Sequence, residues 1–239
     1  MADGAYGDFL AERRAQILGR IEDAARRAGR EPGGISLVAV SKTVGAPELV
    51  AAMEAGYDAF GENRPQELVR KLSALDALGI EPPRFDMVGN LQTNKVNQVL
   101  GRVRLIHSLS SLHLAQAVSK RAEARGMVQE ALLEVNVSGE ASKSGFSPDE
   151  ARAQAEDLMG LAGIRLAGLM SMAPAGDPAA ARASFSGLRE LKDELEARCG
   201  IALPVLSCGM SDDFEIAVEE GSTLVRLGRI VFDRGYTCR

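Results

Sequence analysis

Short apolar runs and helical patterns alternate along nearly the whole chain of 239 residues. Eight runs have the length and the apolar, β-branched character of strands that are buried on both faces. These runs are Ile35–Ser41, Asp58–Gly61, Arg84–Val88, Arg104–His107, Ala131–Val137, Arg165–Met170, Pro204–Ser207 and Thr223–Leu227. The helical patterns between them are Pro47–Ala55, Pro65–Leu78, Leu91–Leu100, Leu112–Ala124, Pro148–Leu161, Pro178–Ala197 and Asp212–Glu219. Such alternation predicts a parallel sheet with right-handed crossovers.

Eight strand–helix repeats in a chain of this length favour an α/β fold closed into a (β/α)8 barrel, the TIM barrel, over an open sheet. An amphipathic pattern over Asp8–Gly29 predicts an extra N-terminal helix, with Asp8 as its cap. Ser147-Pro148-Asp149-Glu150 has the sequence of a capping box, and Asp177-Pro178 repeats the cap-then-proline signal. No long linker interrupts the alternation, so we expect a single domain over residues 1–239.

The composition narrows the classes of function. A net charge of -5 with 26% charged residues gives no electrostatic reason to expect nucleic acid or an anionic membrane as a partner. Cys199, Cys208 and Cys238 form no CxxC motif and fit reduced cytoplasmic thiols better than a disulfide framework. His107 and His113 have no Cys or His cluster nearby, so we expect no metal site. No apolar run suggests a signal peptide or a membrane span.

A barrel places its functional groups just after the strands, at the carboxyl face. The residues at these positions are polar or glycine-containing, unlike the strands before them. They are Lys42, Glu62-Asn63, Gly89-Asn90, His107-Ser108, Asn136, Ser171-Met172, Gly209-Met210-Ser211 and Gly228-Arg229. No GxSxG, HExxH or GxxxxGK[ST] motif occurs, which removes three common enzyme classes.

Lys42 closes the first apolar run, where a lysine is poorly placed to pack but well placed to reach a ligand above the sheet. An aldehyde cofactor needs an amine that is neutral part of the time, and partial desolvation near other cations lowers a lysine pKa toward that state. We therefore expect Lys42 to hold pyridoxal phosphate as a Schiff base. The alternatives are that Lys42 is a solvated loop lysine, or that Lys143, in a Ser/Gly-rich loop, is the reactive amine.

Two loops are candidates for binding a phosphate through backbone N–H groups. Ser207-Cys208-Gly209-Met210-Ser211-Asp212 leads from the seventh strand into a helix, where Ser211 can cap that helix, contact the phosphate, or do both. Gly228-Arg229 follows the eighth strand, and loops after strands seven and eight are the usual phosphate site of this fold. Met210 belongs to the first loop, although methionine side chains more often pack than bind. Cys208 fits a small buried side chain better than a nucleophile.

Arg226 and Asn63 each allow two interpretations. Arg226 lies within the last strand and needs an acceptor, which is either a core carboxylate such as Glu134 or Glu62, or a pyridine nitrogen. Since arginine does not give up its proton, it would keep that nitrogen unprotonated and weaken the ring as an electron sink. Asn63 either caps the helix that begins at Pro65 or contacts the cofactor ring.

Several ordered motifs resemble one known family across about residues 8–232. The motifs are LVAVSKTV, FGENRPQEL, MVGNLQTNK, IHSLSS, EVNVSGEASKSGF, GLMSMAP and LSCGMSDDFEIAVEEGSTLVRLG. They look like the pyridoxal phosphate homeostasis protein family, which includes bacterial YggS-type proteins and the eukaryotic proline synthase co-transcribed homolog. That family is similar to the barrel domain of alanine racemase and of eukaryotic ornithine decarboxylase, the fold-type III group of cofactor enzymes.

The resemblance implies a role for each matching position. Lys42 matches the lysine that binds pyridoxal 5'-phosphate, and Asn63 matches a residue of the ring pocket. Arg226 matches the arginine that faces the pyridine nitrogen. The phosphate cradle is implied by Ser211, with its neighbour Met210, and by the backbone at Gly228-Arg229. Two departures are visible: many members have threonine in place of Arg229 and histidine in place of Asp86. The tail Phe232–Arg239 matches nothing we can assign.

The resemblance also implies a function without turnover. The racemase has a second domain that supplies a catalytic tyrosine across a dimer, and this sequence ends with the barrel. Racemisation needs an acid and a base on opposite faces of Cα, and only Lys42 is evident here. We therefore expect a cytoplasmic, monomeric cofactor-holding protein with no catalytic residues, which passes the cofactor to apo-enzymes. A weak amino-acid racemase is the second hypothesis, and a phosphate-binding barrel for another metabolite is the third.

Overall fold

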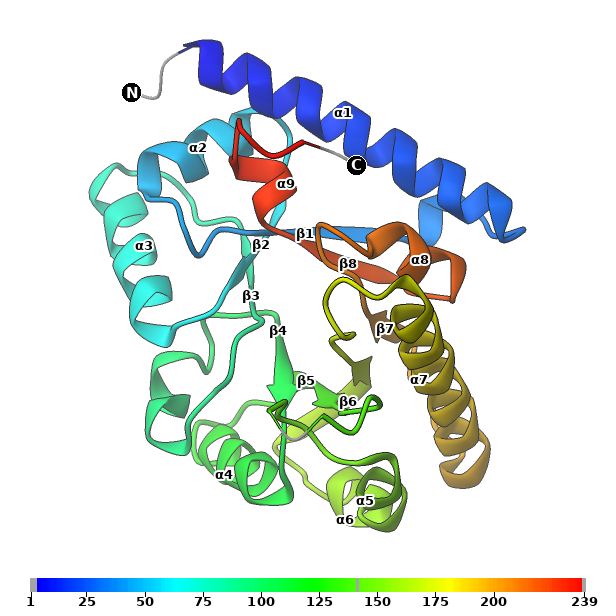
Figure 1. The fold of residues 1–239 in the computed structure, drawn as a ribbon. Helices are drawn as coiled ribbons and strands as arrows, with labels where there is room; N and C mark the ends of the chain where they lie inside the picture. Colours follow the sequence, from blue (N-terminus) through cyan, green and yellow to red (C-terminus); the bar gives the residue numbers. More distant parts are fainter. Residues whose placement is uncertain (1–3, 141, 238–239) are drawn as a thin grey trace.

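Eight parallel strands close a barrel in the computed structural model, which describes residues 4–140 and 142–237 (Figure 1). Each strand pairs with the next, and β8 pairs with β1. The strands are β1 Ser36–Val40, β2 Ala59–Glu62, β3 Arg84–Met87, β4 Leu105–Leu109, β5 Gln129–Glu134, β6 Ile164–Met170, β7 Val205–Ser207 and β8 Leu224–Leu227. The predicted (β/α)8 barrel is therefore confirmed.

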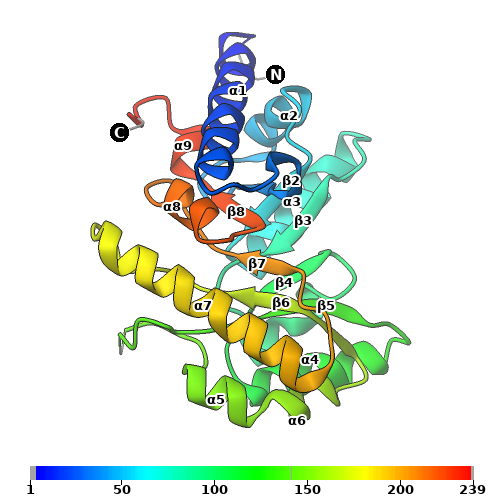
Figure 2. The ribbon, with the colours of Figure 1, turned by 90° about the vertical axis from the view of Figure 1, so that its right-hand side faces the viewer.

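Helices cover the outside of the barrel (Figure 1). They are α1 Gly4–Arg27, α2 Ala46–Glu54, α3 Pro65–Ala77, α4 Leu112–Glu123, α5 Pro148–Ala153, α6 Ala155–Met159, α7 Pro178–Cys199, α8 Phe214–Glu219 and α9 Arg229–Phe232. Two 3-10 helices, η1 Pro32–Gly34 and η2 Thr93–Gln98, complete the described elements. Figure 2 shows the barrel from the side of the long helix α7. No helix in the described ranges is long and apolar enough to cross a membrane.

The extra N-terminal helix is present and packs against α2, α8 and α9. It already includes Gly4, so the expected cap at Asp8 is wrong: Asp8 lies inside the helix. The two other predicted caps are confirmed. Ser147 and Glu150 form the reciprocal capping box of α5, and Asp177 accepts hydrogen bonds from the first amides of α7.

Two predicted helices differ from the structure, and one helix was not predicted. The pattern over 91–100 forms the 3-10 helix η2, whose sequence TNKVNQ is rich in residues with low helix propensity. The pattern over 148–161 is divided into α5 and α6 at Gln154, which leaves helical geometry. The short helix α9 was not predicted, because four residues are too few to show a helical period.

The alternation of side chains along each strand sorts the core into two parts. Outward residues such as Ala39, Phe60 and Val225 pack against the helices. Inward residues form a separate apolar cluster in the barrel: Val38, Ala59, Leu105, Leu132, Ala167, Met170 and Leu224. The barrel also contains buried polar side chains, which are Asp86, His107, Ser207 and Arg226. A packed, largely apolar interior holds its few polar groups in defined positions.

Candidate functional site

Lys42 lies at the carboxyl end of β1. The amide of the preceding residue, Ser41, still donates to Gly61 O of β2 at 2.9 Å, so the ladder extends to the residue before the lysine. Counting alternate residues from the inward Val38 brings Lys42 to the interior side of the barrel mouth. Lys42 is exposed, so the expected partial desolvation is wrong. Its amine makes no hydrogen bond or ion pair within the described ranges, which leaves it available to react.

Lys143, the rival amine, is engaged elsewhere. Its Nζ donates to Met172 O at 3.2 Å and pairs with Glu140, and only 19% of its side chain is exposed. The loop after β5 is thereby tied to the end of β6. A lysine held in this way is less accessible to an aldehyde than Lys42 is.

A buried ion pair supports the ends of the neighbouring strands β1 and β2. Lys71 of α3 pairs with Glu62 of β2, and their side chains are 2% and 0% exposed. Lys71 Nζ also donates to Ser41 O at 2.5 Å, and Ser41 Oγ donates to Glu62 Oε1 at 2.7 Å. The other carboxylate oxygen of Glu62 accepts from the Asn63 amide at 3.3 Å. One buried cluster thus holds the residues next to Lys42 and at Asn63.

Asn63 does not cap α3, which has Arg64 at its N-cap position, so the capping alternative is wrong. The Asn63 side chain is half-buried and has no hydrogen-bond partner among the described residues. An unused amide at this position suits a ligand contact.

Only glycine fits at position 89, because the backbone there lies directly against Asn63. A Cβ at Gly89 would lie 2.3 Å from Asn63 O and 2.5 Å from Asn63 Cα. Gly89→Ala must therefore shift backbone, and we expect urea unfolding to show a loss of about 1–3 kcal/mol. Gly19→Ala, in α1 with open space around it, is the matched control and is expected to be neutral or stabilising. Equal stability of the two variants would contradict the close approach.

Ser211 joins the two loops that were predicted to hold a phosphate. Its Oγ accepts a hydrogen bond from the Ile230 amide at 3.2 Å and so links the β7–α8 loop to the start of α9. The helix α8 begins only at Phe214, so Ser211 does not cap it and that alternative is wrong. Gly228 is the N-cap of α9, and Ser211 and Gly228 therefore lie in neighbouring loops, as a shared cradle requires.

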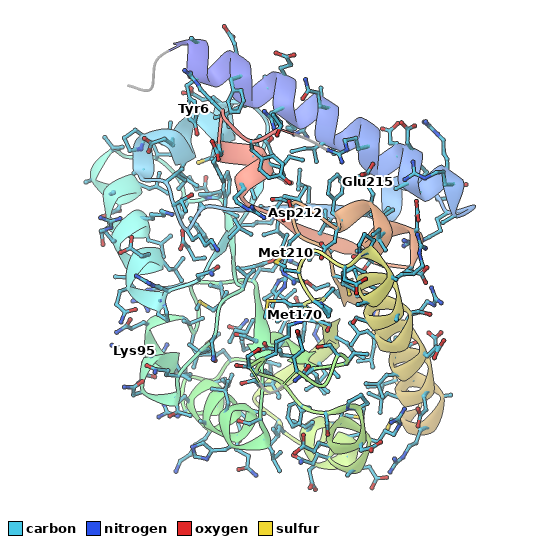
Figure 3. All side chains as sticks on the ribbon, viewed as in Figure 1. Tyr6, Lys95, Met170, Met210, Asp212 and Glu215 are labelled. Carbon is cyan, nitrogen blue, oxygen red and sulfur yellow. The ribbon has the colours of Figure 1, made fainter. Side chains whose placement is uncertain are left out.

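Arg229 and Met210 are exposed residues of these two loops. Arg229 is exposed, pairs with Asp212, and stacks 5.5 Å from the centre of the Tyr236 ring. Met210 is 37% exposed and lies toward the middle of the barrel in Figure 3. Both residues line a cavity of about 730 Å³ with Ser211 and Tyr236. Lys42 is not among its lining residues, so this cavity lies beside the barrel mouth and does not replace it as the candidate site.

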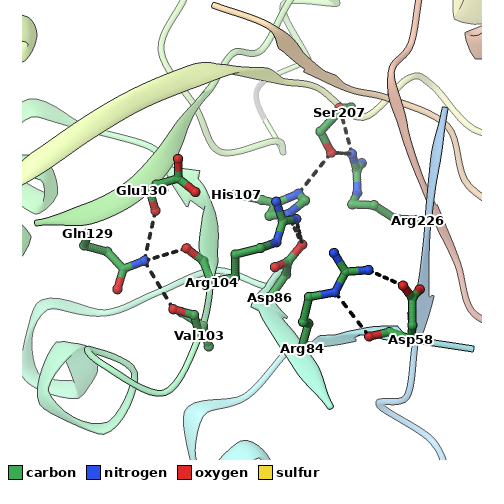
Figure 4. A network of polar contacts seen from close by, with 10 residues as sticks. All are labelled: Asp58, Arg84, Asp86, Val103, Arg104, His107, Gln129, Glu130, Ser207 and Arg226. Carbon is green, nitrogen blue, oxygen red and sulfur yellow. Dashed lines mark hydrogen bonds and ion pairs between the residues drawn. The ribbon is translucent and has the colours of Figure 1, made fainter. Parts of the chain in front are cut away.

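Arg226 is buried in the barrel and makes three hydrogen bonds, of which Figure 4 shows the two to Ser207. Its Nη1 donates to Ser207 O at 2.7 Å and to Ser207 Oγ at 2.6 Å, and its Nη2 donates to Ser171 O at 3.1 Å. A guanidinium has five N–H groups, so two remain without an acceptor in the described ranges.

Neither expected carboxylate partner binds Arg226 directly. Glu62 pairs with Lys71, so that alternative is wrong. Glu134 makes no hydrogen bond to Arg226, and its buried Oε2 has no partner within the described residues. Burial raises the pKa of the Glu134 carboxyl, and the nearby charge of Arg226 opposes this rise. The two remaining N–H groups of Arg226 therefore have no carboxylate acceptor among the described residues.

Cys208 is buried, as expected, and burial raises the pKa of its thiol to about 12. At pH 8 it is therefore protonated and poorly nucleophilic. In a Cys238→Ser variant, which removes a thiol outside the described residues, we expect Ellman's reagent to modify Cys199 in the native protein. Cys208 is expected to react only after urea unfolding. Rapid modification of both thiols in the folded chain would contradict this burial.

The sequence alone did not indicate Lys71 or Ser207 as supporting residues. Lys71 lies between the buried residues Leu68 and Leu75 on the apolar face of α3. A lysine in such a position is a signal for a buried partner. Ser207 had no comparable signal, because a serine at a strand end is ordinary.

The family of the alanine racemase N-terminal domain matches residues 15–233. A pyridoxal phosphate homeostasis protein of Aquifex aeolicus is 43% identical over 223 residues, which cover 92% of this chain and 96% of the relative. PipY of Synechococcus elongatus, solved with PLP bound, is 32% identical with a TM-score of 0.82 and covers 93% of this chain and 99% of its own. An alanine racemase of Clostridium difficile, 17% identical, shares the fold with a TM-score of 0.69 over 92% of this chain and 56% of its own.

Proposed function

This chain belongs to the alanine racemase N-terminal domain family and, within it, to the pyridoxal phosphate homeostasis proteins, and we propose that it holds pyridoxal 5'-phosphate as a Schiff base on Lys42. The amine condenses with the aldehyde of the cofactor and releases one water molecule. The geometry of neighbouring strands carries this proposal. In the β1–β8 register, Val38 lies opposite Arg226, and Lys42 is four residues farther along β1.

The spacing between these residues suits the cofactor. Four residues of extended chain span about 13 Å. The side chains of Lys42 and Arg226, with a pyridine ring between them, would fill this distance. The unused N–H groups of Arg226 would face the ring nitrogen, and Asn63 would line the ring. Ser211 and the backbone at Gly228 and Arg229 would hold the phosphate, with Met210 at the edge of the same loop. PipY, the relative solved with PLP bound, supports this assignment.

We also propose that the chain has no amino-acid turnover. Racemisation needs a second acid or base opposite Lys42, and Arg226 would keep the ring nitrogen unprotonated, which disfavours a carbanion. The relatives are named as homeostasis proteins, which supports a role in holding the cofactor and delivering it to apo-enzymes. The cytoplasmic location and the monomeric state stay predictions.

An absorbance spectrum with added cofactor, followed by borohydride reduction and peptide mapping, tests the assignment. We expect an imine band and a reduced adduct on the peptide that contains Lys42. A colourless protein would favour the third hypothesis, a barrel for another phosphorylated metabolite. Incorporation of solvent deuterium into the Cα of an amino acid, dependent on Lys42, would favour the racemase instead.

A further inference from the structure

A chain of hydrogen bonds runs through the barrel interior below Arg226 (Figure 4). Arg226 Nη1 donates to Ser207 Oγ at 2.6 Å, and this oxygen lies 3.0 Å from His107 Nδ1. His107 Nε2 lies 3.1 Å from Asp86 Oδ2, to which Arg104 Nη2 donates at 2.7 Å. Of these residues, only Arg104, at the amino end of β4, is substantially exposed. We refer to Arg226, Ser207, His107, Asp86 and Arg104 as the interior relay.

The two arginines, which only donate, and the Asp86 carboxylate, which only accepts, limit the directions of the bonds in the interior relay. Arginine only donates, so Ser207 Oγ accepts from Arg226 and its own hydroxyl proton is free for His107 Nδ1. The Asp86 carboxylate only accepts, so His107 Nε2 carries a proton and donates to it. In the neutral ring Nδ1 then carries a lone pair, which can accept from the Ser207 hydroxyl. With His107 in this tautomer, each of these donors meets an acceptor.

The charges around His107 favour the same state. Asp86 of β3 faces Nε2, Arg104 lies beside Asp86, and Arg226 of β8 lies beyond Ser207. Burial lowers the pKa of His107, and the two arginines lower it further, against the opposing effect of Asp86. A protonated ring would direct a second donor at Ser207 Oγ and place a third positive charge between the arginines.

We propose that Ser207, His107 and Asp86 are positioning residues, which fix the Arg226 guanidinium so that its unused N–H groups face the pyridine nitrogen of the cofactor. This inference rests on the proposed function for its ligand, but the hydrogen-bond pattern belongs to the protein alone. It also gives a role to Asp86, one of the two departures from the family pattern. The carboxylate is the acceptor that sets the tautomer of His107.

The tautomer is measured on the wild-type chain without cofactor. In protein labelled with 15N-histidine, we expect long-range 1H–15N spectra to show His107 with a bare Nδ1 and a protonated Nε2 that persist at pH 6. The His113→Gln variant, which removes an exposed histidine, assigns the signals. A protonated Nδ1, or a ring that titrates like a free histidine, would overturn the proposed direction of the relay.

Cofactor binding tests the positioning. Ser207→Ala removes the hydroxyl that accepts from Arg226, and His107→Leu removes the imidazole ring. We expect each variant to weaken cofactor affinity by roughly tenfold and to shift the absorbance of the bound cofactor. His107→Asn keeps an acceptor for Ser207 and is expected to restore most of the affinity. If the wild type binds on Lys42 but the variants bind with unchanged affinity and absorbance, the positioning role is wrong. If the wild type forms no adduct on Lys42, the proposed function itself is wrong, whatever the tautomer.

Discussion

Replacing Lys42 with alanine is expected to abolish the imine band of the bound cofactor. The covalent link is lost, and what remains is the phosphate contact and the ring pocket. We expect affinity to fall at least about 100-fold, or about 2.7 kcal/mol, in equilibrium dialysis against the cofactor. Because Lys42 is exposed and makes no hydrogen bond or ion pair in the described ranges, the variant should unfold at the same urea concentration as the wild type.

Lys143→Ala is the matched control for this experiment. Its amine is bound to Met172 O and paired with Glu140, so its removal should leave the imine band in place. The hypothesis would be wrong if Lys42→Ala kept the band and Lys143→Ala lost it. Borohydride reduction of both variants shows whether the adduct has moved to another lysine or has been lost. Reduction makes an imine permanent, so a moved adduct is found on a different peptide and a lost one on no peptide.

The second large effect concerns the buried pair below the mouth. Lys71→Met leaves the Glu62 carboxylate without its cation in a site closed to water. Breaking a buried ion pair by removing one partner costs about 3–5 kcal/mol. Urea unfolding followed by circular dichroism should show this loss. Because the pair holds Ser41 and Asn63, cofactor affinity should also fall in the variant that still folds.

Two further variants separate the pair from the general effect of losing a lysine. Lys120→Met changes an exposed lysine of α4 and should stay within about 0.5 kcal/mol of the wild type. The double variant Lys71→Met with Glu62→Leu removes both charges and is expected to recover part of the lost stability. A Lys71→Met chain as stable as the Lys120→Met chain would show that the pair contributes little.

The barrel could be predicted because the same strand-and-helix pattern recurs along the sequence. Each run such as Ile35–Ser41 is short and apolar, and the same signal recurs eight times with helical patterns between. Helix type and ends were harder, since η2 and the division at Gln154 depend on packing against neighbours more than on local propensity. The fold therefore follows from the pattern, while single boundaries do not.

For the candidate site, the sequence indicated which loops to examine but not their internal contacts. Lys42, Asn63 and Arg226 are at the carboxyl ends of their strands or within them, as the spacing predicted. The hydroxyl of Ser211 instead bonds Ile230, which is distant from the expected helix cap. Lys71 lies on the apolar face of α3, which signals a buried partner, but the sequence does not show which distant segment Lys71 or Ser207 contacts.

The pairing of β1 with β8 has a consequence for how the protein folds. Lys42 follows the first strand and Arg226 belongs to the last, so the two sides of the proposed pocket come from opposite ends of the chain. Pairing between such distant segments forms slowly and late. A pocket built this way does not exist in a nascent or partly folded chain, and the ligand stabilises only the finished ring. Acquisition of the vitamin chromophore would thus report, in real time, the moment at which the last strand closes on the first.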